Sequence, residues 1–316
     1  MALTQVDQGL LGTYAQYTGF KNRIINGAMV IDQRNAGAAV NGNGGNQTFP
    51  VDRFYSQVYN TTGNTTGQQS TIAPAGFYNS LKLSCQTADA SVGSTDVVWY
   101  GQNIEGFNLA DMNFGSANAA TFTLSFWVYS NLTGTFCVAF KNSAQNRTYV
   151  AEYTINAATT WEKKTITVAG DQSGTWLTNN GVGLNVWFVL MAGSTYQTTP
   201  NTWSASTGNA TSNQVNLLSS TSNYLHITGV QLEKGSTATS FDYRPYGTEL
   251  ALCQRYYEIS DSNTIWSGYI VSGNNYYQSP SFAVTKRASA TMAYTSSANS
   301  GFPATAPLYF SGGTSQ

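Results

Sequence analysis

The stretch "ATFTLSFWVYS", residues 120–130, places an apolar side chain at every second position. Successive side chains of a β-strand point to opposite faces of the sheet, so this alternation predicts a strand with one face in a core. The predicted core face carries Phe122, Leu124, Phe126 and Val128. The stretch "GVGLNVWFVLMA", residues 181–192, repeats the pattern with Val182, Leu184, Val186, Phe188 and Leu190. Both stretches are therefore predicted to be half-buried strands.

Similar alternation recurs between these two stretches. It is present in "TGTFCVAFKN" at 133–142, "RTYVAEYTIN" at 147–156 and "EKKTITVAG" at 162–170. Clusters of Asn, Gly and Ser, such as "NSAQN" at 142–146, separate the strands. Short strands at regular spacing with turn residues between them are typical of sandwiches and jelly rolls. We therefore predict an all-β fold, a jelly-roll β-sandwich.

The last predicted sandwich strand, "YLHITGVQLE" at 224–233, changes its parity in the middle. The apolar residues Leu225 and Ile227 occupy odd-numbered positions, whereas Val230 and Leu232 occupy even-numbered ones, and Gly229 lies where the pattern changes. One extra residue in a strand produces such a switch, and glycine is favoured where the backbone bends. The sequence predicts a β-bulge at Gly229.

After this strand the chain bends at Pro245 and Gly247 and resumes as a short helix, for which Thr248 is the expected N-cap. One face of that helix would carry Leu250, Cys253 and Tyr257. Further alternating stretches at 265–273, 274–287 and 290–297 predict C-terminal strands. The predicted organisation is an N-terminal segment at 1–22, a jelly-roll sandwich at 23–246, and a short helix with a smaller β-rich unit at 247–316.

Charge is scarce in this chain. Asp, Glu, Lys and Arg make up 9% of the residues, against about 25% in ordinary soluble proteins, and the formal net charge is -1. Such a chain has no field to attract nucleic acid or anionic lipid, so neither partner is expected. The N-terminus lacks both a basic start and a long apolar run, so we expect no signal peptide or membrane insertion, and synthesis in a cytoplasm. The widely spaced Cys85, Cys137 and Cys253 are interpreted as packing residues.

The inventory of reactive residues argues against catalysis. The single histidine, His226, falls within a predicted strand, and no G-x-S-x-G motif is present. No cofactor or metal site is expected; "DMNFG" at 111–115 matches a calcium loop only in part and is better explained as a turn. The acidic side chains are scattered singly, for example Glu105, Asp111, Glu152, Glu162 and Asp171. Glycosidases need two carboxylates at one cleft, so a non-enzymatic protein is expected, with a depolymerase as the weaker alternative.

Aromatic side chains are the more informative group. Trp127, Tyr129 and Trp187 lie on strand faces opposite the predicted core residues and are candidates for a subunit interface, with sugar stacking the less favoured explanation. Trp176, Tyr196 and Trp203 fall in loops among Asn, Gln and Thr. Flat rings edged by amides suit a neutral glycan, so these three are candidate glycan-binding residues. The competing explanation is that they fix their own loops to the sandwich.

Five blocks of the sequence form a pattern of their own. They are "NRIINGAMVIDQRNAG" at 22–37, "VDRFYS" at 51–56, the stretch at 123–155 that begins "TLSFWVYS", the stretch at 161–184 that begins "WEKKTITVAG", and the stretch at 227–258 that begins "ITGVQLEKG". In order and spacing these blocks resemble tail-fibre and other virion-appendage proteins of tailed bacteriophages. The resemblance implies a virion structural protein with a jelly roll like that of carbohydrate-binding modules. It further implies assembly as a homotrimer and a role in host attachment.

On this basis we expect a subunit of a trimeric tail fibre or appendage that adheres to the host through surface glycans. The segment 1–22 is the expected attachment point to other virion proteins. Two alternatives remain: a capsid-decoration or tail and baseplate adaptor protein without receptor binding, and, less favoured, a polysaccharide depolymerase.

Overall fold

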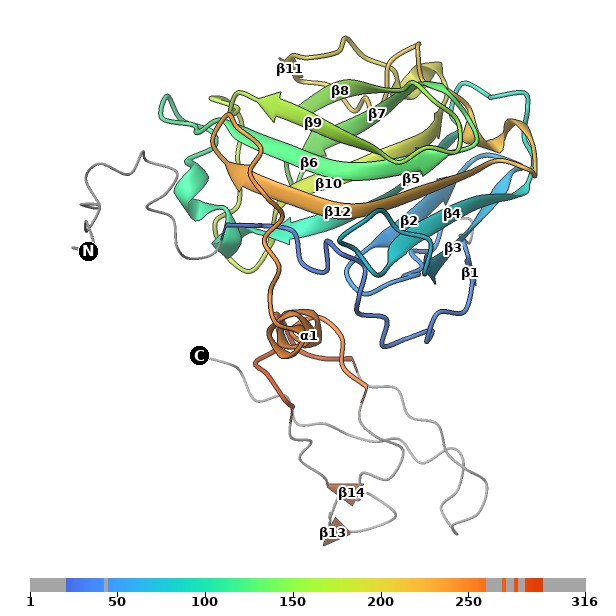
Figure 1. Cartoon of the computed structure of the whole chain (residues 1–316). Helices are drawn as coiled ribbons and strands as arrows, with labels where there is room; N and C mark the ends of the chain where they lie inside the picture. Colours follow the sequence, from blue (N-terminus) through green and yellow to red (C-terminus); the bar gives the residue numbers. More distant parts are fainter. Residues whose placement is uncertain (1–20, 43–44, 260–268, 271–275, 278–281, 292–316) are drawn as a thin grey trace, which may run out of the picture. The chain divides into compact units, whose positions relative to one another are not determined.

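A computed structural model describes residues 21–42, 45–259, 269–270, 276–277 and 282–291. The chain divides into two compact units, Met1–Glu249 and Leu250–Gln316 (Figure 1). Most of the predicted attachment segment 1–22, and most of the predicted C-terminal strands, lie outside the described residues. Among the described residues, no helix is both long enough and apolar enough to cross a bilayer.

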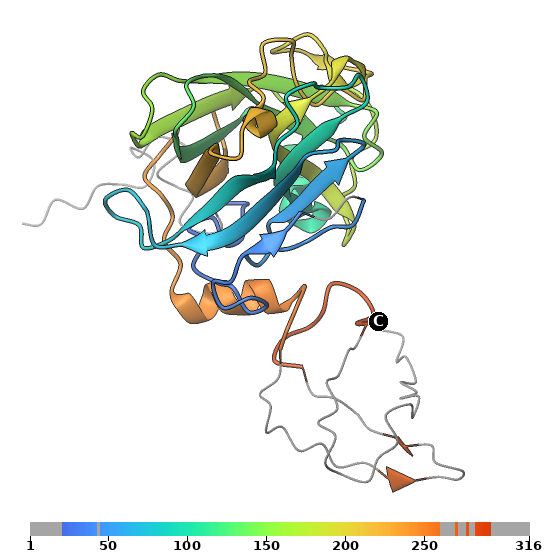
Figure 2. The ribbon, with the colours of Figure 1, turned by 90° about the vertical axis from the view of Figure 1, so that its right-hand side faces the viewer.

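The first unit is a sandwich of two six-stranded antiparallel sheets (Figures 1 and 2). The first sheet has the order β1 (Val40–Asn41), β3 (Asn64–Ser70), β4 (Ser80–Thr87), β12 (Tyr224–Lys234), β6 (Phe122–Ser130) and β9 (Glu162–Val168). The second has the order β11 (Trp203–Ser204), β8 (Thr148–Ile155), β7 (Gly134–Lys141), β10 (Val182–Ala192), β5 (Val97–Glu105) and β2 (Tyr55–Tyr59). Many neighbouring strands are distant in sequence, as in a jelly roll. The predicted all-β sandwich is confirmed.

Short 3-10 helices interrupt the connections between strands. They are η2 (Gly106–Asn108), η3 (Ala110–Met112), η4 (Ser194–Tyr196) and η5 (Leu217–Ser219). In the second unit, the described residues include β13 (Tyr269–Ile270) and β14 (Tyr276–Tyr277), which pair with each other.

The core lies between the two sheets and follows the predicted alternation. Phe122, Leu124, Phe126 and Val128 are all fully buried. Phe126 of β6 meets Phe188 of β10 edge to face, with ring centroids 5.0 Å apart. Edge-to-face contact adds to the gain from burying the rings, so these two strands are joined through their inner faces. The three cysteines are free and buried, which agrees with their interpretation as packing residues.

The predicted β-bulge in β12 is confirmed. The pairing of β12 with β6 runs in register to Thr228 opposite Trp127, and then shifts so that Gln231 lies opposite Ser125. Gly229, inside the shift, has a φ of 60°, in the left-handed region. A Cβ atom there would lie 2.6 Å from the ring of Phe77. The position therefore requires glycine for both its backbone and its surroundings.

We expect Gly229→Ala to lower the free energy of unfolding by about 2 kcal/mol, because it adds a strained backbone and a steric clash. Urea denaturation measures the effect. Gly247→Ala is the matched control, since a Cβ at Gly247 would have no atom within 4 Å. Equal stability of the two variants would contradict this account of the bulge.

The helix α1 (Tyr246–Gln254) corrects the predicted cap. The amide of Glu249 donates to the carbonyl of Pro245 at 3.0 Å, so the helix starts before Thr248, which lies inside its first turn. Pro245 is the better start signal, because its fixed φ suits a helix start and its missing N–H costs nothing there. The prediction of Thr248 as the N-cap is wrong.

Buried hydrogen bonds attach the first described residues to the end of the sandwich. Asn22 accepts from the amides of Ile24 at 2.9 Å and Leu232 at 3.1 Å. The Arg244 guanidinium donates to the carbonyl of Ile24 at 3.1 Å and to both oxygens of Glu249 at 3.2 Å. Glu249 in turn accepts from the amide of Asn26. We call Arg244 and Glu249 the clamp, because this ion pair fixes the segment 22–26 beside the start of α1.

Candidate functional site

Trp176, predicted to bind glycan, is packed into the core. Only 9% of its surface is exposed. Its indole nitrogen donates to the carbonyl of Ser173 at 2.9 Å, and its ring meets Phe114 edge to face at 5.0 Å. This is the packing expected of a ring that fixes its own loop. Trp176 therefore has little surface to offer a sugar.

The other two loop candidates lie in different surroundings. Trp203 belongs to β11, is partly buried against the core and contacts Trp176 edge to face at 5.4 Å. Its indole nitrogen donates to the carbonyl of Ala169 at 2.7 Å. Tyr196 lies in η4 and packs against the outer side of the second sheet. Among the described residues, no ring contact joins Tyr196 to the two tryptophans, so the three candidates do not form one site.

Trp187 is covered by the chain itself. It stacks on Trp99 with ring centroids 4.0 Å apart and planes inclined by 11°. Phe49, Tyr196 and other loop residues pack over this outer cluster, and 3% of the Trp187 surface remains exposed. Trp187, a predicted subunit-interface residue, therefore has little surface to offer a second subunit, because loops of the same chain pack over its face.

The outer face of the first sheet is different. Four aromatic side chains lie there partly exposed: Trp127, Tyr129, Trp161 and Tyr224. We call these four residues the aromatic platform. Tyr129 is the centre, with the ring of Trp161 at 5.3 Å and the ring of Tyr224 at 6.0 Å. The planes of these neighbours are inclined to Tyr129 by 35° and 25°. The three rings are therefore close in both position and tilt.

Strand pairing brings the platform together. Tyr129 of β6 lies opposite His226 of β12. Glu162, the first residue of β9, pairs with Val128 of β6. Trp161, directly before β9, therefore lies beside Tyr129. Side chains on directly paired strands approach within about 5 Å. The sequence prediction found Trp127 and Tyr129 but missed Trp161 and Tyr224, which lie at strand ends and become neighbours only through this register.

His226 forms the floor of the platform. The rings of Tyr129 and Tyr224 meet it edge to face at 5.5 and 5.7 Å, and its own exposed surface is 1%. Burial, with the nearby charge of Lys82, lowers the pKa of His226 to about 4. The imidazole is therefore neutral near pH 7. Its Nδ1 lies 3.0 Å from the hydroxyl of Ser80, so the floor is hydrogen bonded.

Polar side chains border the platform on the neighbouring strands. Lys82 pairs with His226, and Ser84 pairs with Tyr224, so both project from the same outer face. Gln68 of β3 lies opposite Lys82 and continues that row across the sheet. Both Ser84 and Gln68 are partly exposed. This face thus combines apolar rings with hydroxyl, amide and ammonium groups.

Loops cover the other part of the same face. Phe77 lies against Gly229, and its ring packs on those of Phe241 at 5.1 Å and Tyr243 at 5.5 Å. This cluster borders the platform at Trp127, because both Phe77 and Trp127 approach Gly229. The open part of the face is therefore the part that carries Tyr129, Trp161 and Tyr224.

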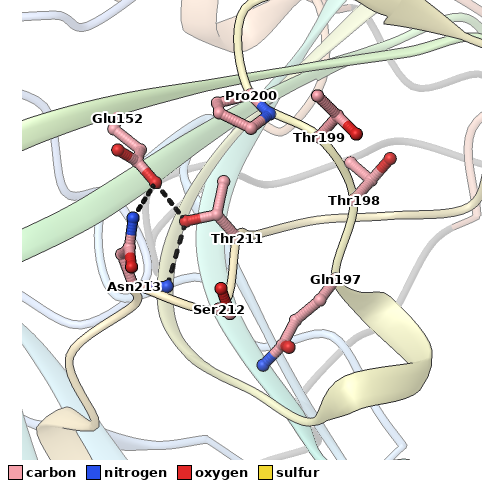
Figure 3. Close-up of a pocket in the computed structure, with 8 residues that line it drawn as sticks. All are labelled: Glu152, Gln197, Thr198, Thr199, Pro200, Thr211, Ser212 and Asn213. Carbon is pink, nitrogen blue, oxygen red and sulfur yellow. Dashed lines mark hydrogen bonds between the residues drawn. The ribbon is translucent and has the colours of Figure 1, made fainter.

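A second surface feature is a polar hollow of about 430 Å³ on the side of the second sheet. It is lined by Glu152, Gln197, Thr198, Thr199, Pro200, Thr211, Ser212 and Asn213 (Figure 3). Glu152 comes from β8, and the other residues come from two loop segments that follow β10. The loop predicted to bind glycan thus contributes to the hollow through residues 197–200 rather than through its aromatic rings.

Three of the other carboxylates considered for chemistry are held in ion pairs. Asp171 accepts two hydrogen bonds from Arg147, both at 2.7 Å, and Glu162 pairs with Lys164 at 2.5 Å. Asp111, in the partial calcium loop, lies 2.9 Å from Arg23 and 3.5 Å from Lys234. Two cations beside Asp111 favour the explanation of this loop as a turn. In the described part of the chain, no group of three or more His, Cys, Asp or Glu side chains is arranged to hold a metal.

Comparison with known proteins gives remote similarities of fold. No family model matches the chain, and no curated protein matches it. Among solved structures, a putative sugar-binding protein from Bacteroides thetaiotaomicron has 13% identity and a TM-score of 0.35, over 68% of this chain and 100% of that one. A family 11 carbohydrate-binding module of a Clostridium thermocellum cellulase has 10% identity and a TM-score of 0.32, over 65% and 98%.

A bacteriophage structure is also among the similar ones. The enzymatically active domain of tailspike protein 4 of bacteriophage CBA120 has 13% identity and a TM-score of 0.34, over 68% of this chain. The chain spans 21% of the length of that structure. Because all these identities and TM-scores are low, these similarities carry no argument about function.

Proposed function

We propose that this chain binds glycans through the aromatic platform, as a non-enzymatic subunit of a bacteriophage virion appendage. The observation that carries the proposal is the group of Tyr129, Trp161 and Tyr224 on an open sheet face. Large apolar side chains on an outer face need an explanation when no described segment of the chain covers them. Trp99 and Trp187 on the second sheet are covered, whereas these three are partly exposed.

A sugar chain suits this surface chemically. The C–H faces of pyranose rings are apolar and pack on aromatic rings, whereas their hydroxyls need donors and acceptors at the border. Gln68, Lys82 and Ser84 supply such groups beside the rings. Neutral His226 adds no charge below the rings. We therefore propose a neutral glycan as the ligand, whose hydroxyl oxygens accept from the Lys82 ammonium at the border, and binding that depends only weakly on salt.

The test is a glycan array that also carries host polysaccharides, probed with the full-length chain and with the double variant Tyr129→Ala/Trp161→Ala. We expect the parent to bind neutral glycans, and the double variant to lose about tenfold to a hundredfold in affinity, because aromatic contacts dominate such sites. Tyr59→Ala is the control, since Tyr59 lies on β2 of the other sheet and is 46% exposed. Equal binding by the parent and the double variant would exclude the platform.

The virion role is supported by the blocks of sequence that resemble tail-fibre proteins, and assembly as a homotrimer belongs to the same proposal. The segment 1–22 would join the subunit to other virion proteins. The adaptor alternative without receptor binding is favoured by one observation, because partly exposed Trp127 and Tyr129 would also suit a subunit interface.

Light scattering on the full-length protein tests the assembly. We expect the mass of a trimer that persists on dilution, because permanent interfaces are large and apolar. A stable monomer would refute the trimer, and the platform would then be open in the isolated chain.

A further inference from the structure

The polar hollow beside Glu152 lies away from the aromatic platform, on the side of the second sheet. Strand β8 provides Glu152, and the segments 197–200 and 211–213 provide the remaining lining (Figure 3). Apart from Pro200, the side chains shown in Figure 3 carry hydroxyl, amide or carboxylate groups, and none is aromatic or basic. A ligand here would be held by hydrogen bonds rather than by stacking.

The walls of the hollow are fixed in place before any ligand arrives. The amide of Thr198 donates to the carbonyl of Ala210 at 2.9 Å, which ties the two loop segments together. The amide of Asn201 donates to the carbonyl of Val150 at 2.8 Å, which ties the first segment to β8. A site with preformed walls loses less conformational entropy when a ligand binds.

Glu152 is held by one carboxylate oxygen only. Its Oε1 accepts from the Thr211 hydroxyl and from the Asn213 side-chain amide, the latter at 3.0 Å. No described residue donates to Oε2. The orientation of the carboxylate is therefore set, while one oxygen remains available as an acceptor.

The charge of Glu152 is also not neutralised within the described part of the chain. Asp52, Asp171, Glu162 and Glu249 each lie in an ion pair with Arg or Lys. No described cation forms an ion pair with Glu152. An oriented carboxylate in a hollow of hydroxyls and amides accepts strongly from a ligand hydroxyl and repels a ligand carboxylate.

We propose that the hollow is a second saccharide site, which binds one or two residues of an uncharged sugar and excludes acidic sugars. This deepens the proposed function and rests on it, since both describe the chain as a glycan-binding protein. A sugar hydroxyl donates to the Glu152 carboxylate, and other sugar oxygens meet the exposed groups of Thr199, Ser212 and Asn213. A volume of about 430 Å³ is in the range of small-ligand sites.

Saturation-transfer NMR on the full-length protein tests the site. The probes are glucose, galactose, mannose and N-acetylglucosamine, with glucuronate as the acidic counterpart. We expect at least one neutral sugar to bind and glucuronate not to bind. Glu152→Gln should weaken the neutral sugar about tenfold, because it replaces a charged acceptor but keeps the shape of the side chain.

Two control variants separate this site from its surroundings and from the platform. Glu162→Gln changes a carboxylate that is paired with Lys164 on the first sheet, and it should leave binding unchanged. In the background of Tyr129→Ala/Trp161→Ala, which disables the platform, Glu152→Gln should still weaken the binding that remains about tenfold. Ser212→Ala, at an exposed residue, should weaken binding a few-fold without any effect on folding.

The outcomes are distinguishable. Three results would each overturn the second site. The first is equal binding of the sugar by the parent and Glu152→Gln, and the second is a parent that binds no neutral sugar. The third is binding of glucuronate with the same affinity as glucose. If the double variant Tyr129→Ala/Trp161→Ala still loses glycan in those cases, the platform stands and only the second site fails. If the parent binds no saccharide in either experiment, both fail.

Discussion

Arg244→Ala is expected to lower the free energy of unfolding by about 3–5 kcal/mol. The variant leaves the Glu249 carboxylate without its cation, and removal of one partner from a buried ion pair leaves a costly uncompensated charge. Both side chains of this pair are 10% exposed. The carbonyl of Ile24 loses its donor as well, so the segment 22–26 is released together with the charge. Urea denaturation followed by circular dichroism measures the loss.

A double-mutant cycle shows whether the charge is the cause. Glu249→Gln alone keeps an acceptor for the amide of Asn26 and should cost less than Arg244→Ala. Combined with Arg244→Ala, it should recover part of the stability, because no charge is then left unpaired. Additive losses in the double variant would contradict the clamp as described.

The second large effect concerns the buried Lys141. Its exposed surface is 1%, and its ammonium donates to the carbonyl of Thr207 at 2.8 Å and to the side chain of Asn209 at 2.5 Å. Burial lowers the pKa of Lys141 to about 7 from an ordinary value of 10.5. Between these two pH values Lys141 is protonated in the unfolded chain and deprotonated in the folded chain, so the free energy of unfolding rises with pH.

We expect the free energy of unfolding to rise by up to about 1.4 kcal/mol per pH unit between pH 7 and 9. Above pH 9, Tyr55 and Tyr100 have the opposite effect on the free energy of unfolding. Burial raises the pKa of each to about 12, so the folded chain retains protons that the unfolded chain loses, and stability falls as pH rises. Lys141→Met should lose this rise, and its free energy of unfolding should fall slightly towards pH 9, because burial raises the pKa of the Cys85 and Cys137 thiols and the folded chain retains their protons. Parallel profiles for the parent and Lys141→Met would refute a buried lysine of low pKa.

Local patterns were sufficient to predict the sandwich and its inner faces. The alternation around Phe126 and the change of parity at Gly229 are properties of one strand, and both were read correctly from the sequence. The start of α1 is also a local feature, because Pro245 directly precedes the helix and marks its first turn.

The surfaces could not be predicted in the same way. Trp127 and Trp187 have the same local pattern, but loops bury the second and leave the first partly exposed, and the cover of Trp187 comes from residues distant in sequence. Trp161 and Tyr224 join Tyr129 through the register of separate strands. Glu152 meets Thr211 and Asn213 only because the loop after β10 returns over β8. Each of these neighbourhoods depends on long-range pairing that a single sequence does not display.

The most direct measurement of the central claim is hydroxyl-radical footprinting of the platform rings, with and without the glycan that binds best on the array. We predict that Tyr129, Trp161 and Tyr224 are oxidised in the free protein and become protected when the glycan is added. Tyr59, 46% exposed on the other sheet, should be oxidised equally in both states. Rings already protected in the free protein would indicate a subunit interface, and rings that stay oxidised with the glycan bound would contradict the platform as the binding surface.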